Sequence, residues 1–198
     1  MFYENLNKSN SIFYNSFIKS LKKLNKKDSY ILGKNLSEFE NNFARYLGAN
    51  HCIGVANGLD ALTMSLKSLE LPKNSEVLVA SNSYFACILS ILNASLKPVL
   101  IEPNLETYNI DPNQIKKKIT KKTRAVLAVH LYGKSCEMDE IIKICKKNDL
   151  YLLEDCAQCH GSKYKNKSTG TFGDFGCFSF YPTKILGGIG DLLDGDNR

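Results

Sequence analysis

The chain has 198 residues, 43% of them hydrophobic and 23% charged, a composition typical of one globular domain rather than of a disordered or fibrous chain. No apolar run approaches the roughly 20 residues that cross a bilayer, and the N-terminus lacks the layout of a secretory signal, so we expect a cytoplasmic protein. The net charge of +6 does not predict nucleic-acid binding, because no aromatic side chains for base stacking lie among the lysines.

The first 28 residues form an N-terminal segment rich in Asn, Lys and Ser, and residues 29–198 form the expected domain. Helical spacing first becomes clear at Leu36, Phe39 and Phe43, and Gly48 is placed to end that helix. Further on, short apolar runs alternate with helical patterns. Strands are expected at 52–56, 76–80, 98–101, 125–130, 151–154 and 176–180, with helices near 59–69, 85–94, from 111–112 onward and near 138–145.

This alternation predicts an α/β fold of three αβα layers around a mostly parallel central sheet. The seven cysteines are odd in number and lie mostly in apolar runs, so we expect free thiols that pack as small hydrophobes. Ligands of such sheets bind at the carboxyl ends of the strands. The residues that directly follow each expected strand are therefore the candidates for function.

Two of these strand ends carry groups that suit a flat, phosphorylated ligand. Asn57, Gly58, Leu59 and Asp60 lead straight into a helix, where free backbone N–H groups attract an anion; a plain helix cap is the alternative. Tyr84 follows the second strand and could cover a flat ring, although a core tyrosine would fit as well. A histidine at the end of the fourth strand, His130, is more often structural than catalytic.

The last two strand ends carry charges. Glu154 and Asp155 end a buried strand, where a carboxylate needs a partner; a protonated pyridine nitrogen would serve Asp155, and backbone hydrogen bonds are the alternative. Lys184 follows the final strand and could form an imine with an aldehyde, while Ser179 could donate to a phosphate. Phosphate cradle, ring cover, ring-nitrogen partner and imine lysine together are what pyridoxal 5'-phosphate requires.

At these residues the sequence resembles the DegT/DnrJ/EryC1/StrS sugar aminotransferases, which have the type I aspartate-aminotransferase fold. The motifs Asn-Gly-Leu-Asp-Ala-Leu, His-Leu-Tyr-Gly, Glu-Asp-x-Ala-Gln-x-His-Gly and Ser-Phe-x-x-x-Lys occur in that order. The resemblance implies that Lys184 holds the cofactor as an imine, that Asp155 pairs with the pyridinium nitrogen and that Gln158 bonds near the ring hydroxyl. The phosphate would be held by Ser179 and the turn of Gly58, Leu59 and Asp60, and Tyr84 would stack on the ring.

The same resemblance implies transamination of a nucleotide-linked keto sugar, with glutamate as the amino donor, for the synthesis of surface polysaccharides. The motifs favour a dTDP-3-keto-6-deoxyhexose as substrate, and a 4-keto sugar is the alternative. Members of the family act as homodimers, so a homodimer is expected. No metal site is expected.

The sequence departs from the family pattern after Gly190-Asp191. The family's last central strand and small C-terminal domain are missing, so we expect the strand at 52–56 to have an unpaired edge. This predicts an incomplete domain, unstable or inactive as it stands.

Three other interpretations are open. The spacing Cys156-x-x-Cys159 suits a zinc or redox module, although no second pair completes a zinc site. A sugar dehydratase of the same fold would have histidine in place of Lys184. The third alternative is a non-catalytic remnant that associates with an intact relative.

Overall fold

The computed structural model describes residues 5–27, 31–188 and 194–196. A seven-stranded sheet has the order β1-β9-β8-β5-β4-β2-β3. Its strands are β1 (His51–Ile53), β2 (Glu76–Ala80), β3 (Lys97–Ile101), β4 (Thr123–Val129), β5 (Tyr151–Asp155), β8 (Phe175–Cys177) and β9 (Asp194–Asp196). A small separate hairpin pairs β6 (Lys163–Tyr164) with β7 (Lys167–Ser168).

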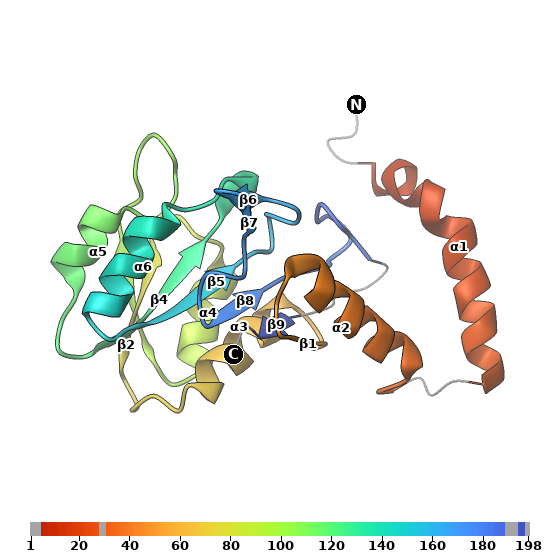
Figure 1. Cartoon of the computed structure of the whole chain (residues 1–198), viewed down its shortest axis with the longest axis horizontal. Coiled ribbons are helices and arrows are strands. Elements are labelled where there is room, and N and C mark those ends of the chain that lie inside the picture. Colours follow the sequence, from red (N-terminus) through yellow and green to blue (C-terminus); the bar gives the residue numbers. More distant parts are fainter. Residues whose placement is uncertain (1–4, 28–30, 189–193, 197–198) are drawn as a thin grey trace.

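The helices are α1 (Leu6–Lys27), α2 (Lys34–Leu47), α3 (Gly58–Ser68), α4 (Phe85–Asn93), α5 (Pro112–Lys118) and α6 (Met138–Lys147), and a short 3-10 turn, η1, spans Leu131–Gly133. Strands β3, β2, β4, β5 and β8 run parallel, and helices cover the sheet (Figure 1). The predicted three-layer α/β architecture with a mostly parallel sheet is confirmed. None of the helices in the described ranges is both long enough and apolar enough to cross a membrane.

Successive side chains of β2 point to opposite faces of the sheet, and helices cover both faces. Val77 points into the core that α3 and α4 complete, with Ile91 among its members. Its neighbour Leu78 points into the opposite core, which α5 and α6 complete, with Ile141 among its members. Successive strand residues face opposite sides of a sheet, so a strand buried on both faces must be apolar throughout.

Local signals set the helix ends where the sequence predicted them. Gly48 ends α2 with φ 77°, and its N–H donates to the carbonyl of Ala44 at 2.9 Å. Glycine adopts this left-handed conformation without steric cost. Asp111 caps α5 by accepting from the N–H of Asn113 at 2.8 Å, and Pro112 occupies the first helical position.

Two predicted strands are shorter than the sequence suggested. The strand expected at 176–180 ends at Cys177, because Phe178 and Phe180 turn away to pack edge-on against Phe43 of α2, with ring centroids 5.0 and 5.2 Å apart. The strand expected at 52–56 ends at Ile53, because the N–H of Gly54 donates to a carboxylate of α2 at 2.7 Å instead of to a strand.

The unpaired edge expected at the first strand is wrong. Strand β9 lies between β1 and β8 and runs antiparallel to both. Its residue Asp196 lies opposite His51 of β1 on one side and opposite Phe175 of β8 on the other. Ladder hydrogen bonds use only backbone groups, so any extended segment can fill this position in the sheet. The first strand therefore joins the sheet through residues 194–196.

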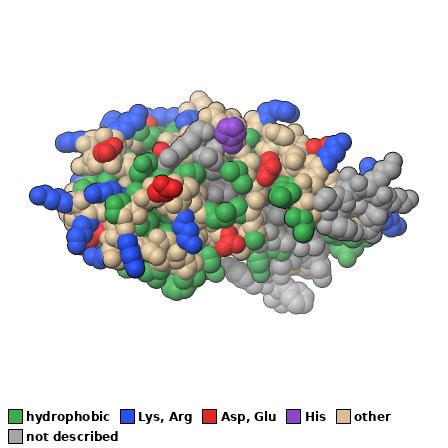
Figure 2. All heavy atoms as spheres, turned by 90° about the horizontal axis from the view of Figure 1, so that it is seen from below, with side chains coloured by type: hydrophobic (Ala, Val, Ile, Leu, Met, Phe, Trp, Pro, Cys, Tyr) green, Lys and Arg blue, Asp and Glu red, His purple; other side chains and the backbone are tan. Residues whose placement is uncertain are grey.

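Helix α1 lies in the segment for which the sequence predicted no regular pattern, and it stands apart from the sheet in Figure 1. Its exposed side chains include Ile12 and Phe13. Figure 2 shows Lys and Arg side chains gathered toward the opposite end of the molecule, with acidic side chains among them. On α6, Glu140 pairs with Lys143 at 2.8 Å and with Lys116 of α5 at 3.8 Å, as on a solvated surface.

Candidate functional site

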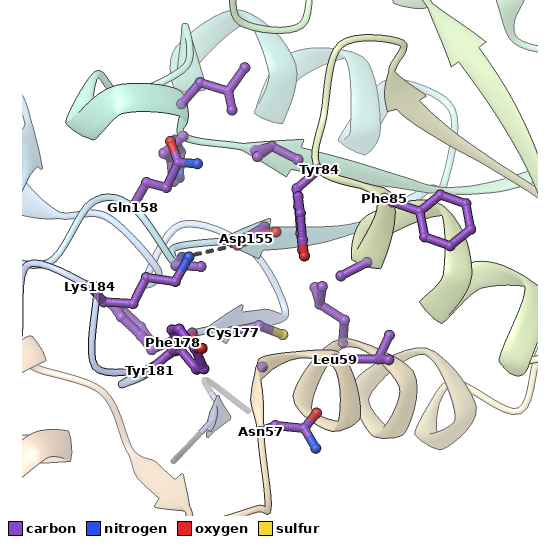
Figure 3. A pocket seen from close by; sticks show the side chains of 18 of the residues that line it. Asn57, Leu59, Tyr84, Phe85, Asp155, Gln158, Cys177, Phe178, Tyr181 and Lys184 are labelled. Carbon is purple, nitrogen blue, oxygen red and sulfur yellow. Dashed lines mark hydrogen bonds between the residues drawn. The ribbon is translucent and has the colours of Figure 1, made fainter. Parts of the chain in front are cut away.

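A cavity of about 690 Å³ opens at the carboxyl ends of the parallel strands. Seven of the eight predicted site residues line it: Gly58, Leu59, Tyr84, Asp155, Gln158, Ser179 and Lys184. In Figure 3 Lys184 and Tyr84 extend into this cavity from different elements, with Asp155 between them. Segments that lie up to 126 residues apart, from Gly58 to Lys184, thus meet in one place.

The eighth predicted residue, Asp60, lies in the first turn of α3 and is not among the lining residues. Its N–H donates to Oδ1 of Asn57 at 2.8 Å, and its Oδ2 accepts from Nδ2 of Asn57 at 3.0 Å. Asn57 thus caps α3, and the Asp60 carboxylate holds the capping side chain in place. Asp60 therefore stabilises the turn that faces the cavity.

The first turn of α3 lies against Ser179 at unusually close range. A Cβ atom on Gly58 would stand 3.0 Å from Cβ of Ser179, so only glycine allows this approach without displacement. The Ser179 hydroxyl, 3.6 Å from the same point, is buried and accepts from the N–H of Tyr181 at 3.4 Å. Helix N–H groups and a hydroxyl beside them form a site that suits an anion such as a phosphate.

Asp155 ends β5 and lines the cavity, and the residue as a whole is 7% exposed. Oδ1 accepts from the N–H of Ala157 at 2.9 Å, and Oδ2 accepts from the thiol of Cys87 at 3.0 Å. Two donors thus hold the carboxylate in one orientation. A buried carboxylate in this position is suited to pair with a cation that enters the cavity.

Its neighbour Glu154 is fully buried and has its partners within the fold. Oε2 lies 2.9 Å from Nε2 of His130 and 2.8 Å from the N–H of Gly170, and Oε1 accepts from the N–H groups of Phe172 and Gly173 at 2.7 and 2.8 Å. Of the two carboxylates for which the sequence predicted a cationic partner, Glu154 thus has its hydrogen-bond donors inside the protein instead. His130 also lines the cavity, and both of its ring nitrogens have partners within the fold, as a structural role requires.

Tyr84 and Gln158 flank the upper part of the cavity in Figure 3. Tyr84 is 71% exposed, which excludes the alternative of a core tyrosine. Oε1 of Gln158 accepts from the N–H of Tyr132 at 2.8 Å, and this contact orients the amide. An amide held by its oxygen presents its nitrogen as a donor.

His160, to which the sequence gave no role, lies near enough to Lys184 to be affected by its charge. Its ring packs edge-on against Phe178 and Phe180, at 5.5 and 5.0 Å between centroids. Neither ring nitrogen has a hydrogen-bond partner within the described part of the chain. Burial and then the charge of Lys184 lower the pKa of His160 to about 4. The imidazole is therefore neutral at physiological pH.

The pair Cys156 and Cys159 lies in the core beside His130, with their ligand atoms all within 4.8 Å of one another. Among the described residues this group offers three ligands, whereas structural zinc sites use four. Both ring nitrogens of His130 are engaged, since Nδ1 accepts from the N–H of Cys136 at 3.1 Å. The two thiols are better explained as packing within the core that α2 completes.

Comparison with known proteins gives consistent relatives. The dTDP-3-amino-3,6-dideoxy-α-D-galactopyranose transaminase of Aneurinibacillus thermoaerophilus is 52% identical over 151 residues, which are 76% of this chain and 42% of that protein. The GDP-perosamine synthase of Escherichia coli O157:H7 is 38% identical over 154 residues, 78% of this chain and 42% of that protein. The chain thus spans less than half the length of these curated relatives.

Among solved structures, S. venezuelae DesV in complex with a ketimine intermediate superposes with a TM-score of 0.94 at 34% identity, over 98% of this chain and 53% of that one. A family model described as the DegT/DnrJ/EryC1/StrS aminotransferase family matches residues 12–191. Because that match takes in nearly all of the 198 residues, the chain belongs to the DegT/DnrJ/EryC1/StrS aminotransferase family.

Proposed function

We propose that this chain forms the cofactor-binding part of a pyridoxal-phosphate-dependent transaminase of nucleotide-linked keto sugars. The observation that carries the proposal is the meeting of Lys184, Asp155 and the first turn of α3 in one cavity. A primary amine, a buried carboxylate and an anion site are the three features that the aldehyde, the ring nitrogen and the phosphate of this cofactor need.

The residues of the cavity fit the cofactor on geometric grounds. The close approach of Gly58 to Ser179 brings the first turn of α3 and the serine hydroxyl together at the cavity, where the N–H groups of Gly58 and Leu59 and that hydroxyl would bind the phosphate. Asp60 would act through the cap that it forms with Asn57.

Three further residues would orient the ring. Tyr84 would cover one face and exclude water, the amide nitrogen of Gln158 would donate to the ring hydroxyl, and Asp155 would accept from the protonated ring nitrogen. When bound, pyridoxal phosphate supplies an aldehyde that carries amino groups and a ring that withdraws electrons. The negative charge of Asp155 would favour the protonated form of the ring nitrogen.

Lys184 would hold the cofactor covalently and, when released, would move protons. Its amine lies at the cavity beside Asp155 in Figure 3, within reach of groups bound between the two residues. An amine that alternates between its charged and neutral forms can accept a proton from a substrate carbon and return it. We therefore assign the roles of general base and general acid to Lys184.

For the substrate we propose a dTDP-linked 3-keto-6-deoxyhexose. The relative named as a dTDP-3-amino-3,6-dideoxy-sugar transaminase is 52% identical to this chain, and the GDP-perosamine synthase is 38% identical. A 4-keto sugar is the second candidate. Glutamate as the amino donor, a homodimer and a cytoplasmic location belong to the same proposal.

Absorbance spectroscopy tests the cofactor assignment. Pyridoxal phosphate added to the purified chain should give the band of a lysine-bound cofactor, and Lys184→Ala should remove it. Lys163→Ala, at an exposed lysine on β6, is the matched control and should keep the band. An unchanged band in Lys184→Ala would contradict the assignment. Assays with glutamate and a panel of keto sugars then separate an active transaminase from an inactive remnant.

A further inference from the structure

Cys87 makes the contact with Asp155 that the sequence did not anticipate. It lies in the first turn of α4, is completely buried, and its Sγ is 3.0 Å from Oδ2 of Asp155, 68 residues away in the chain. The other carboxylate oxygen is held by the N–H of Ala157. The thiol is thus one of two donors that set the orientation of the carboxylate.

The thiol remains a donor over the whole physiological pH range. Burial, followed by the negative charge of Asp155, raises the pKa of Cys87 far above its ordinary value of 9.0. A protonated thiol donates to the carboxylate, whereas a thiolate would repel it. The contact is therefore a hydrogen bond from the thiol to the carboxylate, as the distance of 3.0 Å indicates.

The same helix turn also places the ring that covers the cavity. Tyr84 caps α4, and its carbonyl accepts from the N–H of Cys87 at 2.9 Å. Tyr84 lines the cavity, as Figure 3 shows, together with Asp155. Cys87 lies in the core, where its thiol contacts the Asp155 carboxylate. One helix turn is thus connected both to the ring cover and to the acidic side chain.

We propose that Cys87 is a positioning residue of the site, whose thiol holds the Asp155 carboxylate in the orientation that pairs with the ring nitrogen of the bound cofactor. This inference rests on the proposed function. It assigns to a buried core cysteine a role in ligand affinity in addition to its packing.

The test uses two ligands that cannot react with Lys184. One is 4-deoxypyridoxine 5'-phosphate, which lacks the aldehyde; the other is the same phosphate ester with a benzene ring, which also lacks the nitrogen. The ratio of their affinities, measured by calorimetry, reports the contact between Asp155 and the ring nitrogen. Cys87→Ala should reduce this ratio about fivefold, since one hydrogen bond to a charged group is lost.

Three variants distinguish positioning from packing. Cys87→Ser retains a donor and should restore most of the ratio, and Cys145→Ala, a buried cysteine on α6, should leave it unchanged. In an Asp155→Asn chain the ratio should already be low, and adding Cys87→Ala should change it less than about twofold. Circular dichroism before each titration confirms that the variants are folded.

The outcomes separate this inference from the proposed function. A wild-type chain that binds both ligands equally would contradict the role of Asp155 and overturn both proposals. A wild-type chain that prefers the pyridine, with an equal preference in Cys87→Ala, would overturn the role of Cys87 alone. A serine variant as weak as the alanine variant would also overturn it, because the donor would then be irrelevant.

Discussion

Nε2 of His130 lies 2.9 Å from Oε2 of Glu154, and both side chains are completely buried. Because Nδ1 of His130 accepts from the N–H of Cys136, the proton of the neutral ring lies on Nε2, which donates to the carboxylate. Glu154 also accepts from three backbone N–H groups of residues 170–173. One buried acid thus joins the end of β4 to the loop before β8.

Removing the charge of Glu154 should destabilise the fold. Glu154→Gln keeps the shape but places amide protons against existing donors, so we expect a loss of about 3 kcal/mol in the free energy of unfolding. Urea denaturation measures it. Glu102→Gln, at an exposed site, should change stability by less than about 0.5 kcal/mol. Equal stability of the two variants would show that the Glu154 network is dispensable.

Gly58→Ala tests the close approach of α3 to Ser179. The added Cβ would stand 3.0 Å from Cβ of Ser179 and push the turn away from the serine hydroxyl. We expect the affinity for pyridoxal phosphate to fall about tenfold, the loss expected for a charge-assisted hydrogen bond. Pyridoxal without its phosphate is the control ligand. If both ligands lose affinity equally, the turn does not bind phosphate.

The variant Asp60→Ala tests whether Asp60 only supports the cap of α3 or also contacts the cofactor. Asp60→Ala removes the contact with Nδ2 of Asn57, so the free energy of unfolding should fall by about 0.5 kcal/mol. The affinity for pyridoxal phosphate should fall less than about threefold, against about tenfold for Ser179→Ala. Parallel titrations measure both. A larger loss in Asp60→Ala than in Ser179→Ala would mean that the carboxylate touches the cofactor.

His160 should make stability depend on pH. Its pKa in the folded chain, about 4, is below the ordinary 6.5, so the unfolded chain takes up the proton first as the pH falls. Stability from this group is therefore complete above pH 6.5 and is lost as the pH falls toward about 4. Urea midpoints at pH 7 and pH 5 should differ less in His160→Phe than in the wild type. An equal difference would contradict the assignment.

The charge of Lys184 contributes to that shift, so Lys184→Ala should raise the pKa of His160. Burial makes the larger contribution, and the pKa should stay below 6.5. An NMR titration of the imidazole carbon-bound proton measures the change. No change would place the Lys184 ammonium away from His160 in solution.

The sequence predicted the carboxyl ends of β2, β3, β4 and β5 to within one residue, because in each of them a short apolar run is followed by a polar residue. Asp155, Ser179 and Lys184 were identified from this pattern, and the cavity contains all three. Tyr84 remained ambiguous in the sequence, since a tyrosine after a strand fits both a core and a cavity. Only its exposure decided between the two.

The partners of the buried acids could not be predicted in the same way. His130 meets Glu154 because β4 and β5 pair in the register that sets Val129 opposite Asp155. Cys87 meets Asp155 because α4 packs on the sheet with Cys87 in the core between them. Strand register and helix packing are tertiary features, and the sequence of a single segment does not determine either of them.

Strand β1 enters the sheet through β9, and His51 pairs with Asp196, 145 positions later in the chain. On a ribosome the early strand emerges long before its partner is translated. Its backbone groups must stay hydrated until that moment, and a contact of such long range is slow to form. This margin of the sheet is therefore expected to form later than the pairing of β2 with β3, in which Glu76 lies opposite Lys97, 21 positions later in the chain.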